Sequence, residues 1–151
     1  MDANKSYFFR CANCGTKNRI PAAMVGKVGK CGNCGQTLRT QELLSGEPLM
    51  VTDANFDAVV VKSPMPVLVY CWAPWCPTCT QTAPIIEGFA NDAKGRVRVG
   101  KLNVDPNPAL SARFDVRSVP FLMIFDHGRL VESISGGLPK HELMMKMAKF
   151  L

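Results

Sequence analysis

Six of the seven cysteines in this 151-residue chain fall into three Cys-x-x-Cys pairs, and no other feature restricts its fold as strongly. The pairs are Cys11 with Cys14, Cys31 with Cys34, and Cys76 with Cys79. The N-terminus has no apolar stretch of signal-peptide length, and the longest apolar run, around residues 67–75, is too short to span a membrane. We therefore expect a cytoplasmic protein with no membrane partner, whose cysteines serve metal binding or redox catalysis rather than structural disulfides.

The first two pairs have the spacing of a four-cysteine zinc ribbon, with sixteen residues between them. A turn of two residues aims both sulfurs of a pair at one ion, and the glycine after each pair, Gly15 or Gly35, permits a positive φ where the backbone closes around the metal. The segment between the pairs is too poor in large apolar residues to fold without a metal. We predict one structural Zn²⁺, held by Cys11, Cys14, Cys31 and Cys34.

Basic residues are concentrated in this first part of a chain whose net charge is +6, with seven Lys/Arg against three Asp/Glu in residues 1–48. Four thiolates and one Zn²⁺ would add −2 there, so the basic excess does not indicate nucleic-acid binding, and we expect no such partner. Two alternatives stay open for the ribbon. It could carry two redox-active dithiols, or it could contact a partner through Tyr7, Phe8, Phe9, Arg10, Lys17 and Arg19.

The composition, 47% hydrophobic and 20% charged, fits one ordinary domain with a small appendage. We predict a ribbon over residues 1–40, a linker over 41–48 and a second domain over 49–151. In the second domain, periodicity predicts helices and strands in alternation. The expected helices are 53–62, 75–92 with a kink at Pro84, 108–114 and 139–151; the expected strands are 66–72, 96–104, and 120–125 with 129–134 as a hairpin. This order predicts an α/β sandwich, with its sheet flanked by helices.

The third pair stands where a buried strand runs into a helix, and this position indicates redox chemistry. With Cys76 as N-cap and Pro77 at the first helical position, free amides and the positive end of the helix dipole favour a thiolate at Cys76. Cys79 lies three residues on, on the same helix face but deeper, where it can attack a mixed disulfide formed on Cys76. We predict that these two cysteines are catalytic.

The chain resembles the thioredoxins and, because of its N-terminal cysteines, looks most like their zinc-binding thioredoxin-2 class. The matching segments are Trp72-Ala73-Pro74-Trp75-Cys76 with Cys79, Pro84, Lys101-Leu102-Asn103-Val104-Asp105, Ser118-Val119-Pro120 and Gly136. The resemblance implies a thioredoxin fold, a central mixed sheet flanked by helices. It also implies a protein-disulfide reductase, with disulfide-containing proteins as substrates and an NADPH-dependent thioredoxin reductase as the electron donor. No organic cofactor is expected in this chain.

The same resemblance implies a substrate groove beside the cysteines. Pro120 would be cis, which leaves the Val119 backbone free to pair with an extended peptide. Trp75 and Gly136 would line the groove.

Two departures from the family pattern bear on the chemistry. The dipeptide between the cysteines is Pro77-Thr78 where the family has Gly-Pro, and this is closer to the Cys-Pro-x-Cys of glutaredoxins. Tyr70 stands where thioredoxins place a buried aspartate, and a tyrosine cannot act as a base near neutral pH. Proton removal from Cys79 would then need water, Lys101 or another route. Two alternatives follow: a more oxidising glutaredoxin-like or isomerase-like enzyme, or a redox-responsive zinc binding module with weak turnover.

Overall fold

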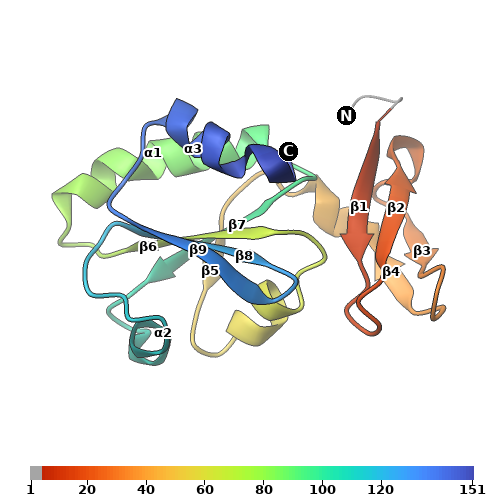
Figure 1. The fold of residues 1–151 in the computed structure, drawn as a ribbon, viewed down its shortest axis with the longest axis horizontal. Helices are drawn as coiled ribbons and strands as arrows, with labels where there is room; N and C mark the ends of the chain where they lie inside the picture. Colours follow the sequence, from red (N-terminus) through yellow and green to blue (C-terminus); the bar gives the residue numbers. More distant parts are fainter. Residues whose placement is uncertain (1–4) are drawn as a thin grey trace.

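The computed structural model describes residues 5–151, which form two parts of unequal size (Figure 1). The smaller part contains two antiparallel hairpins. Strand β1 (Ser6–Arg10) pairs with β2 (Lys17–Pro21), and β3 (Val28–Lys30) pairs with β4 (Thr37–Arg39). Two short 3-10 helices, η1 (Ala22–Met24) and η2 (Thr40–Leu44), follow β2 and β4. We call this part, β1 to η2, the cysteine ribbon.

The larger part is built on a five-stranded mixed sheet with the order β5-β7-β6-β8-β9. Strands β5 (Leu49–Val51), β7 (Arg98–Asn103) and β6 (Val67–Trp72) run parallel to one another. Strands β8 (Phe121–Asp126) and β9 (Arg129–Ser135) form an antiparallel hairpin beside β6. The turn of this hairpin is His127-Gly128, and both residues have a positive φ, as a two-residue hairpin turn requires.

Helices cover both faces of this sheet, which confirms the predicted α/β thioredoxin fold. Helix α1 (Pro77–Asp92) and helix α3 (Lys140–Met147), followed by the 3-10 turn η4 (Ala148–Phe150), lie on one face (Figure 1). Helix α2 (Pro108–Arg113) lies on the other. Pro84 lies inside α1, as expected. The central strand β6 sends Leu68 and Tyr70 into the core under α1 and sends Val69 and Cys71 into the opposite core.

The predicted helix over residues 53–62 is wrong in extent. The chain makes one turn from Thr52, whose hydroxyl accepts the Asn55 amide at 3.2 Å, and then a π-helical turn, η3 (Asp57–Val61). Three consecutive valines with low helix propensity, followed by Ser63-Pro64, oppose a longer helix. Phe56 and Val60 of this segment are nevertheless buried. Strand β5 was not predicted, because three residues are too few to show an alternating pattern.

The cysteine ribbon is fixed against the larger part of the chain. Met65, in the loop before β6, is buried in the same apolar cluster as Tyr7, Phe9 and Leu43 of the ribbon. Arg10 donates hydrogen bonds to the carbonyls of Val61 (2.9 Å) and Ser63 (2.8 Å).

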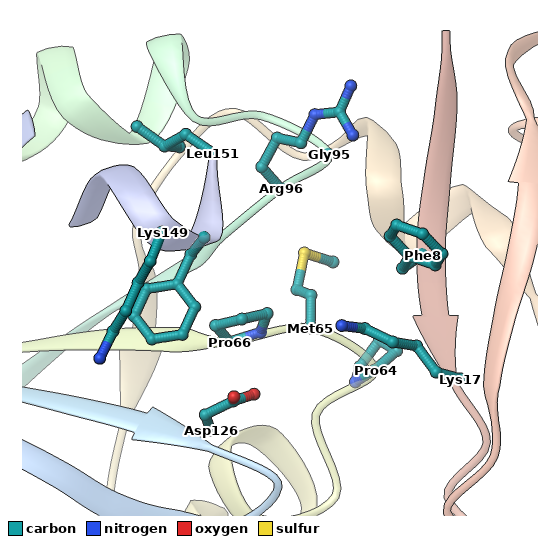
Figure 2. A pocket seen from close by; sticks show the side chains of 11 residues that line it. Phe8, Lys17, Pro64, Met65, Pro66, Gly95, Arg96, Asp126, Lys149 and Leu151 are labelled. Atoms are coloured by element: carbon teal, nitrogen blue, oxygen red, sulfur yellow. The ribbon is translucent and has the colours of Figure 1, made fainter.

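A second arginine, Arg96 of the larger part, also contacts the ribbon. The Arg96 guanidinium lies 4.2 Å from the Tyr7 ring centroid and donates to the Ser6 carbonyl at 2.9 Å. A pocket of about 220 Å³ between the two parts is lined by residues of both, including Phe8 and Met65 (Figure 2). Because Arg96 follows the C-terminal end of α1, the ribbon lies at the opposite end of this helix from Cys76 (Figure 1).

Within residues 5–151, no helix has both the length and the apolar character needed to cross a membrane.

Candidate active site and metal centre

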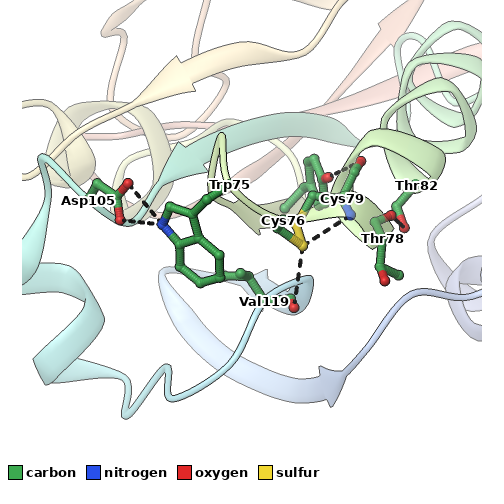
Figure 3. The surroundings of a disulfide bond; sticks show 8 residues. Trp75, Cys76, Thr78, Cys79, Thr82, Asp105 and Val119 are labelled. Carbon is green, nitrogen blue, oxygen red and sulfur yellow. Dashed lines mark hydrogen bonds between the residues drawn. A yellow bond between two sulfur atoms is a disulfide. The ribbon is translucent and has the colours of Figure 1, made fainter.

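The third cysteine pair lies at the start of α1, directly after the carboxyl end of β6. Cys76 is the N-cap of the helix and Pro77 is its first residue, as predicted. The Cys76 sulfur accepts the amide of Cys79 at 3.1 Å, and the two cysteines form a disulfide with a Cα–Cα distance of 5.2 Å (Figure 3). Pro77 and Thr78, between them, are exposed. The capping amide that contacts the Cys76 sulfur is well placed to stabilise a thiolate when the pair is reduced.

The loop before β8 faces this disulfide. The Val119–Pro120 peptide bond is cis, as the resemblance implied, and the Val119 carbonyl oxygen lies 3.6 Å from the Cys76 sulfur (Figure 3). In the disulfide this is a contact, whereas the reduced thiol could donate a hydrogen bond there. Gly136 has a φ of 88° and donates its amide to the Pro120 carbonyl at 2.9 Å. The fold therefore brings together three segments that the sequence analysis selected separately.

Trp75 forms an exposed apolar surface beside the cysteines. Its side chain is held by Asp105, whose two carboxylate oxygens accept the indole N–H at 3.3 and 3.2 Å (Figure 3). Trp75 is still 66% exposed, so the ring is positioned without being buried. No role was predicted for Asp105, although it ends the segment 101–105 that resembles the thioredoxins.

Tyr70 is buried directly beneath the pair. Its hydroxyl donates to the Cys79 carbonyl at 2.8 Å, and burial raises the pKa of the phenol to about 12. Tyr70 is therefore neutral at physiological pH and cannot remove a proton from Cys79, which agrees with the prediction. The hydrogen bond to the first turn of α1 was not foreseen.

Cys71, the next residue of β6, faces the opposite core. Burial there raises the pKa of its thiol to about 12, so its thiolate is absent at neutral pH.

The four remaining cysteines gather in the ribbon. The sulfurs of Cys11, Cys14, Cys31 and Cys34 all lie within 4.8 Å of one another. The Cys11–Cys34 and Cys14–Cys31 sulfur distances are both 3.6 Å. In a tetrahedral zinc site with Zn–S bonds of about 2.3 Å, the sulfurs are about 3.8 Å apart, so this donor set fits Zn²⁺.

The two loops that carry these cysteines have the same backbone geometry. The carbonyl of Cys11 accepts the amide of Gly15 at 2.9 Å, and the carbonyl of Cys31 accepts the amide of Gly35 at 2.9 Å. Both glycines have the predicted positive φ, 79° and 77°. The hydroxyl of Thr16 is the main cause that lowers the pKa of Cys14 to about 5, which favours the thiolate that a metal requires.

Comparison with known proteins identifies the larger part. A sequence profile of the family described as Thioredoxin matches residues 47–149. The chain belongs to the thioredoxin family. A thioredoxin of Haemophilus influenzae is 43% identical over 97 residues, which are 64% of this chain and 91% of that protein. Thioredoxins of Synechocystis sp. and Porphyra purpurea are 42% and 39% identical over 101 residues, which are 67% of this chain and 94% of each relative.

As a thioredoxin homologue, the chain is a thiol-disulfide oxidoreductase. The family match begins at residue 47, so the four cysteines of the ribbon lie outside it, whereas Cys76, Cys79 and the Val119–Pro120 bond lie within it.

Proposed function

We propose that this protein is a protein-disulfide reductase in which Cys76 attacks and Cys79 resolves. The proposal is supported mainly by the position of Cys76 at the N-cap of α1. There its sulfur accepts a hydrogen bond from the Cys79 amide and faces the Val119 carbonyl oxygen. The two residues are almost equally buried, 5% and 3% exposed, so the helix position rather than accessibility distinguishes them.

The chemistry is an exchange of one disulfide for another. The Cys76 thiolate attacks a substrate disulfide, forms a mixed disulfide and releases one substrate thiolate. Cys79 then loses its proton and attacks the Cys76 sulfur. The second substrate thiolate leaves and takes up a proton. Two electrons pass to the substrate, and the Cys76–Cys79 disulfide is left.

The surroundings of Cys76 support loose recognition of extended peptides. The Val119 backbone would pair with the substrate as an added strand, while Trp75, Pro77 and Thr78 offer side-chain contacts and Gly136, next to Pro120, leaves room for the peptide backbone. By family membership we infer that an NADPH-dependent thioredoxin reductase restores the dithiol in the cytoplasm.

We expect the protein to catalyse the reduction of insulin by dithiothreitol, and by NADPH with a thioredoxin reductase. The rate of insulin precipitation measures this activity. Cys76→Ser should abolish catalysis because it removes the attacking sulfur. Cys71→Ala removes a thiol from the opposite core and should retain most of the activity. Failure of the unmodified protein to accelerate either reaction would contradict the proposal.

We further propose that Cys11, Cys14, Cys31 and Cys34 hold one Zn²⁺ in a structural role. Four thiolates leave no open coordination position for a substrate, which is typical of structural sites. The proposal is supported by the matched geometry of the two cysteine loops and by the distance of the ribbon from Cys76 along α1. Bound zinc would stabilise the fold of the ribbon.

We expect the purified protein to contain one zinc ion per chain. In the Cys34→Ser variant, the zinc content should fall well below one per chain. After removal of zinc by a chelator under reducing conditions, hydrogen exchange should lose protection in β1 to β4, because the metal joins the two hairpins. The five-stranded sheet should keep its protection, and insulin reduction should remain above half of its original rate. Loss of activity in proportion to zinc would show that the metal is needed for the redox step.

A further inference from the structure

The cysteine ribbon carries an excess of positive charge. Residues 5–44 contain seven Lys/Arg and one acidic residue, Glu42. This carboxylate is itself paired with Arg98 of the larger part, whose guanidinium lies 3.0 Å away. Four thiolates and one Zn²⁺ would add −2 to the ribbon, which does not cancel the excess.

The two hairpins of the ribbon present this charge in the same way. Each exposes one apolar side chain, with an arginine directly opposite in the sheet register and a lysine on the same face. We call these six residues the basic faces of the ribbon: Phe8, Lys17, Arg19, Val28, Lys30 and Arg39. Phe8 is 47% exposed and Val28 is 67% exposed, so both faces are open to solvent. The Lys17 ammonium lies 4.9 Å from the centroid of the Phe8 ring.

The four cations of the basic faces have no acidic partner in the described part of the chain. No carboxylate of residues 5–151 lies within 4 Å of Lys17, Arg19, Lys30 or Arg39. Arg19 donates one hydrogen bond, to the hydroxyl of Ser6 at 2.9 Å, and this leaves its charge in place. The basic faces are therefore complementary to a partner that carries negative charge.

The apolar members of the basic faces indicate which kind of anionic partner fits. Protein surfaces that bind single-stranded nucleic acid use exposed aromatic rings on which successive bases stack. Of the three aromatic residues within residues 5–44, Tyr7 and Phe9 are buried in the core of the ribbon and Phe8 is exposed. The second face offers Val28, on which a base cannot stack. An acidic polypeptide needs no row of rings, so the basic faces fit a protein segment better than a nucleic acid.

We propose that the basic faces of the ribbon bind an acidic segment of the substrate protein while its disulfide is reduced at Cys76. The proposal rests on the proposed function, which supplies the protein substrate. The ribbon is fixed to the larger part and lies at the opposite end of α1 from Cys76 (Figure 1), and this helix of 16 residues is about 24 Å long. A substrate whose acidic segment lies that far from its disulfide would contact both places at once. Contact at the ribbon raises the encounter rate and the effective concentration of the disulfide at Cys76.

The test uses synthetic peptides that carry one disulfide ring, a Gly/Ser linker and a tail, with the zinc-loaded protein. A linker of about 20 residues has a root-mean-square span of about 25 Å, which matches the length of α1. With a tail of about eight glutamates, kcat/KM at low salt should be about tenfold higher than with a serine tail of equal length. The gain should disappear in about 1 M salt, where the Debye length is about 3 Å. A lysine tail should give no gain.

Neutralising the four cations of the basic faces together should remove most of the gain. In the variant with Lys17→Gln, Arg19→Gln, Lys30→Gln and Arg39→Gln, the glutamate tail should raise kcat/KM by about threefold or less. The matched control neutralises two exposed lysines and two exposed arginines of the larger part and should keep the full gain; it carries Lys94→Gln, Lys140→Gln, Arg113→Gln and Arg129→Gln. Zinc content and the rate with the serine tail check that both variants are folded.

Equal kcat/KM values for the glutamate and serine tails in the unmodified protein would overturn the proposal, as would an equal loss of the gain in the control variant. A single-stranded oligonucleotide that displaced the glutamate tail at a much lower concentration would also overturn it, because the basic faces would then be a nucleic-acid surface.

Fluorescence anisotropy of the labelled linker and glutamate tail, without the disulfide ring, measures binding to the ribbon in the absence of turnover. Binding that requires the four cations, together with no reduction of any peptide, would support the basic faces and contradict the proposed function. Reduction of the serine-tailed peptide with no binding of the glutamate tail would support the proposed function and overturn the role of the basic faces.

Discussion

Replacement of Cys79 by serine is expected to trap stable mixed disulfides between Cys76 and protein substrates. The attacking thiolate remains at the N-cap of α1, but no sulfur is left to displace the substrate. Adducts that accumulated only transiently in the unmodified protein should then persist for hours. Non-reducing gels of the tagged variant, with and without later reduction, measure the number and lifetime of these adducts.

Cys76→Ser is the matched control, because it makes the same replacement of sulfur by oxygen in the other cysteine of the pair. It should trap few proteins, since Cys79 does not occupy the N-cap position of α1. Equal trapping by the two variants would remove the distinction between attacker and resolver. Strong trapping by Cys76→Ser alone would reverse the assignment.

The reduction potential of the Cys76–Cys79 pair is expected to lie above the value of about −270 mV typical of thioredoxin, at about −200 to −230 mV. A buried carboxylate next to a dithiol opposes the thiolate through like-charge repulsion, whereas Tyr70 is neutral and donates its hydrogen bond to the Cys79 carbonyl. A reduced form that is relatively more stable makes the pair a better oxidant. A difference of 30 mV corresponds to about 1.4 kcal/mol.

Equilibration with glutathione buffers measures this potential, and two variants test its cause. Tyr70→Phe keeps the ring and stays neutral, so the potential should change little, although loss of the buried hydrogen bond should lower the free energy of unfolding by about 1 kcal/mol. Tyr70→Asp should lower the potential and raise the pKa of the Cys76 thiol. A potential at or below −270 mV in the unmodified protein would show that Tyr70 does not have this effect.

The parts of the fold that depend on local pattern could be predicted from the sequence. Strand β6 is apolar on both faces because helices cover both, and the cysteine N-cap with a following proline marked the start of α1. The positive φ values of Gly15 and Gly35 followed from the turn that each cysteine pair requires. In each case a few neighbouring residues fix the conformation.

The features that were missed depend on contacts between distant segments. Strand β5 exists because it pairs with β7, not because of an alternating pattern of its own. Met65 packs into the core of the ribbon, and Arg10 binds carbonyls more than fifty residues away, which no local signal reveals. The hydroxyl of Tyr70 reaches a helix carbonyl only after the sheet and α1 have packed together.

The roles of the three cysteine pairs are tested by a single turnover of the fully reduced, zinc-loaded protein with one protein disulfide, quenched by alkylation and resolved by mass spectrometry. We predict that the Cys76–Cys79 disulfide forms one for one with the appearance of substrate thiols, while Cys11, Cys14, Cys31 and Cys34 stay unoxidised. Substrate thiols that appear together with oxidation of the four ribbon cysteines, with Cys76 and Cys79 still reduced, would show that the redox site lies in the ribbon and not at Cys76 and Cys79.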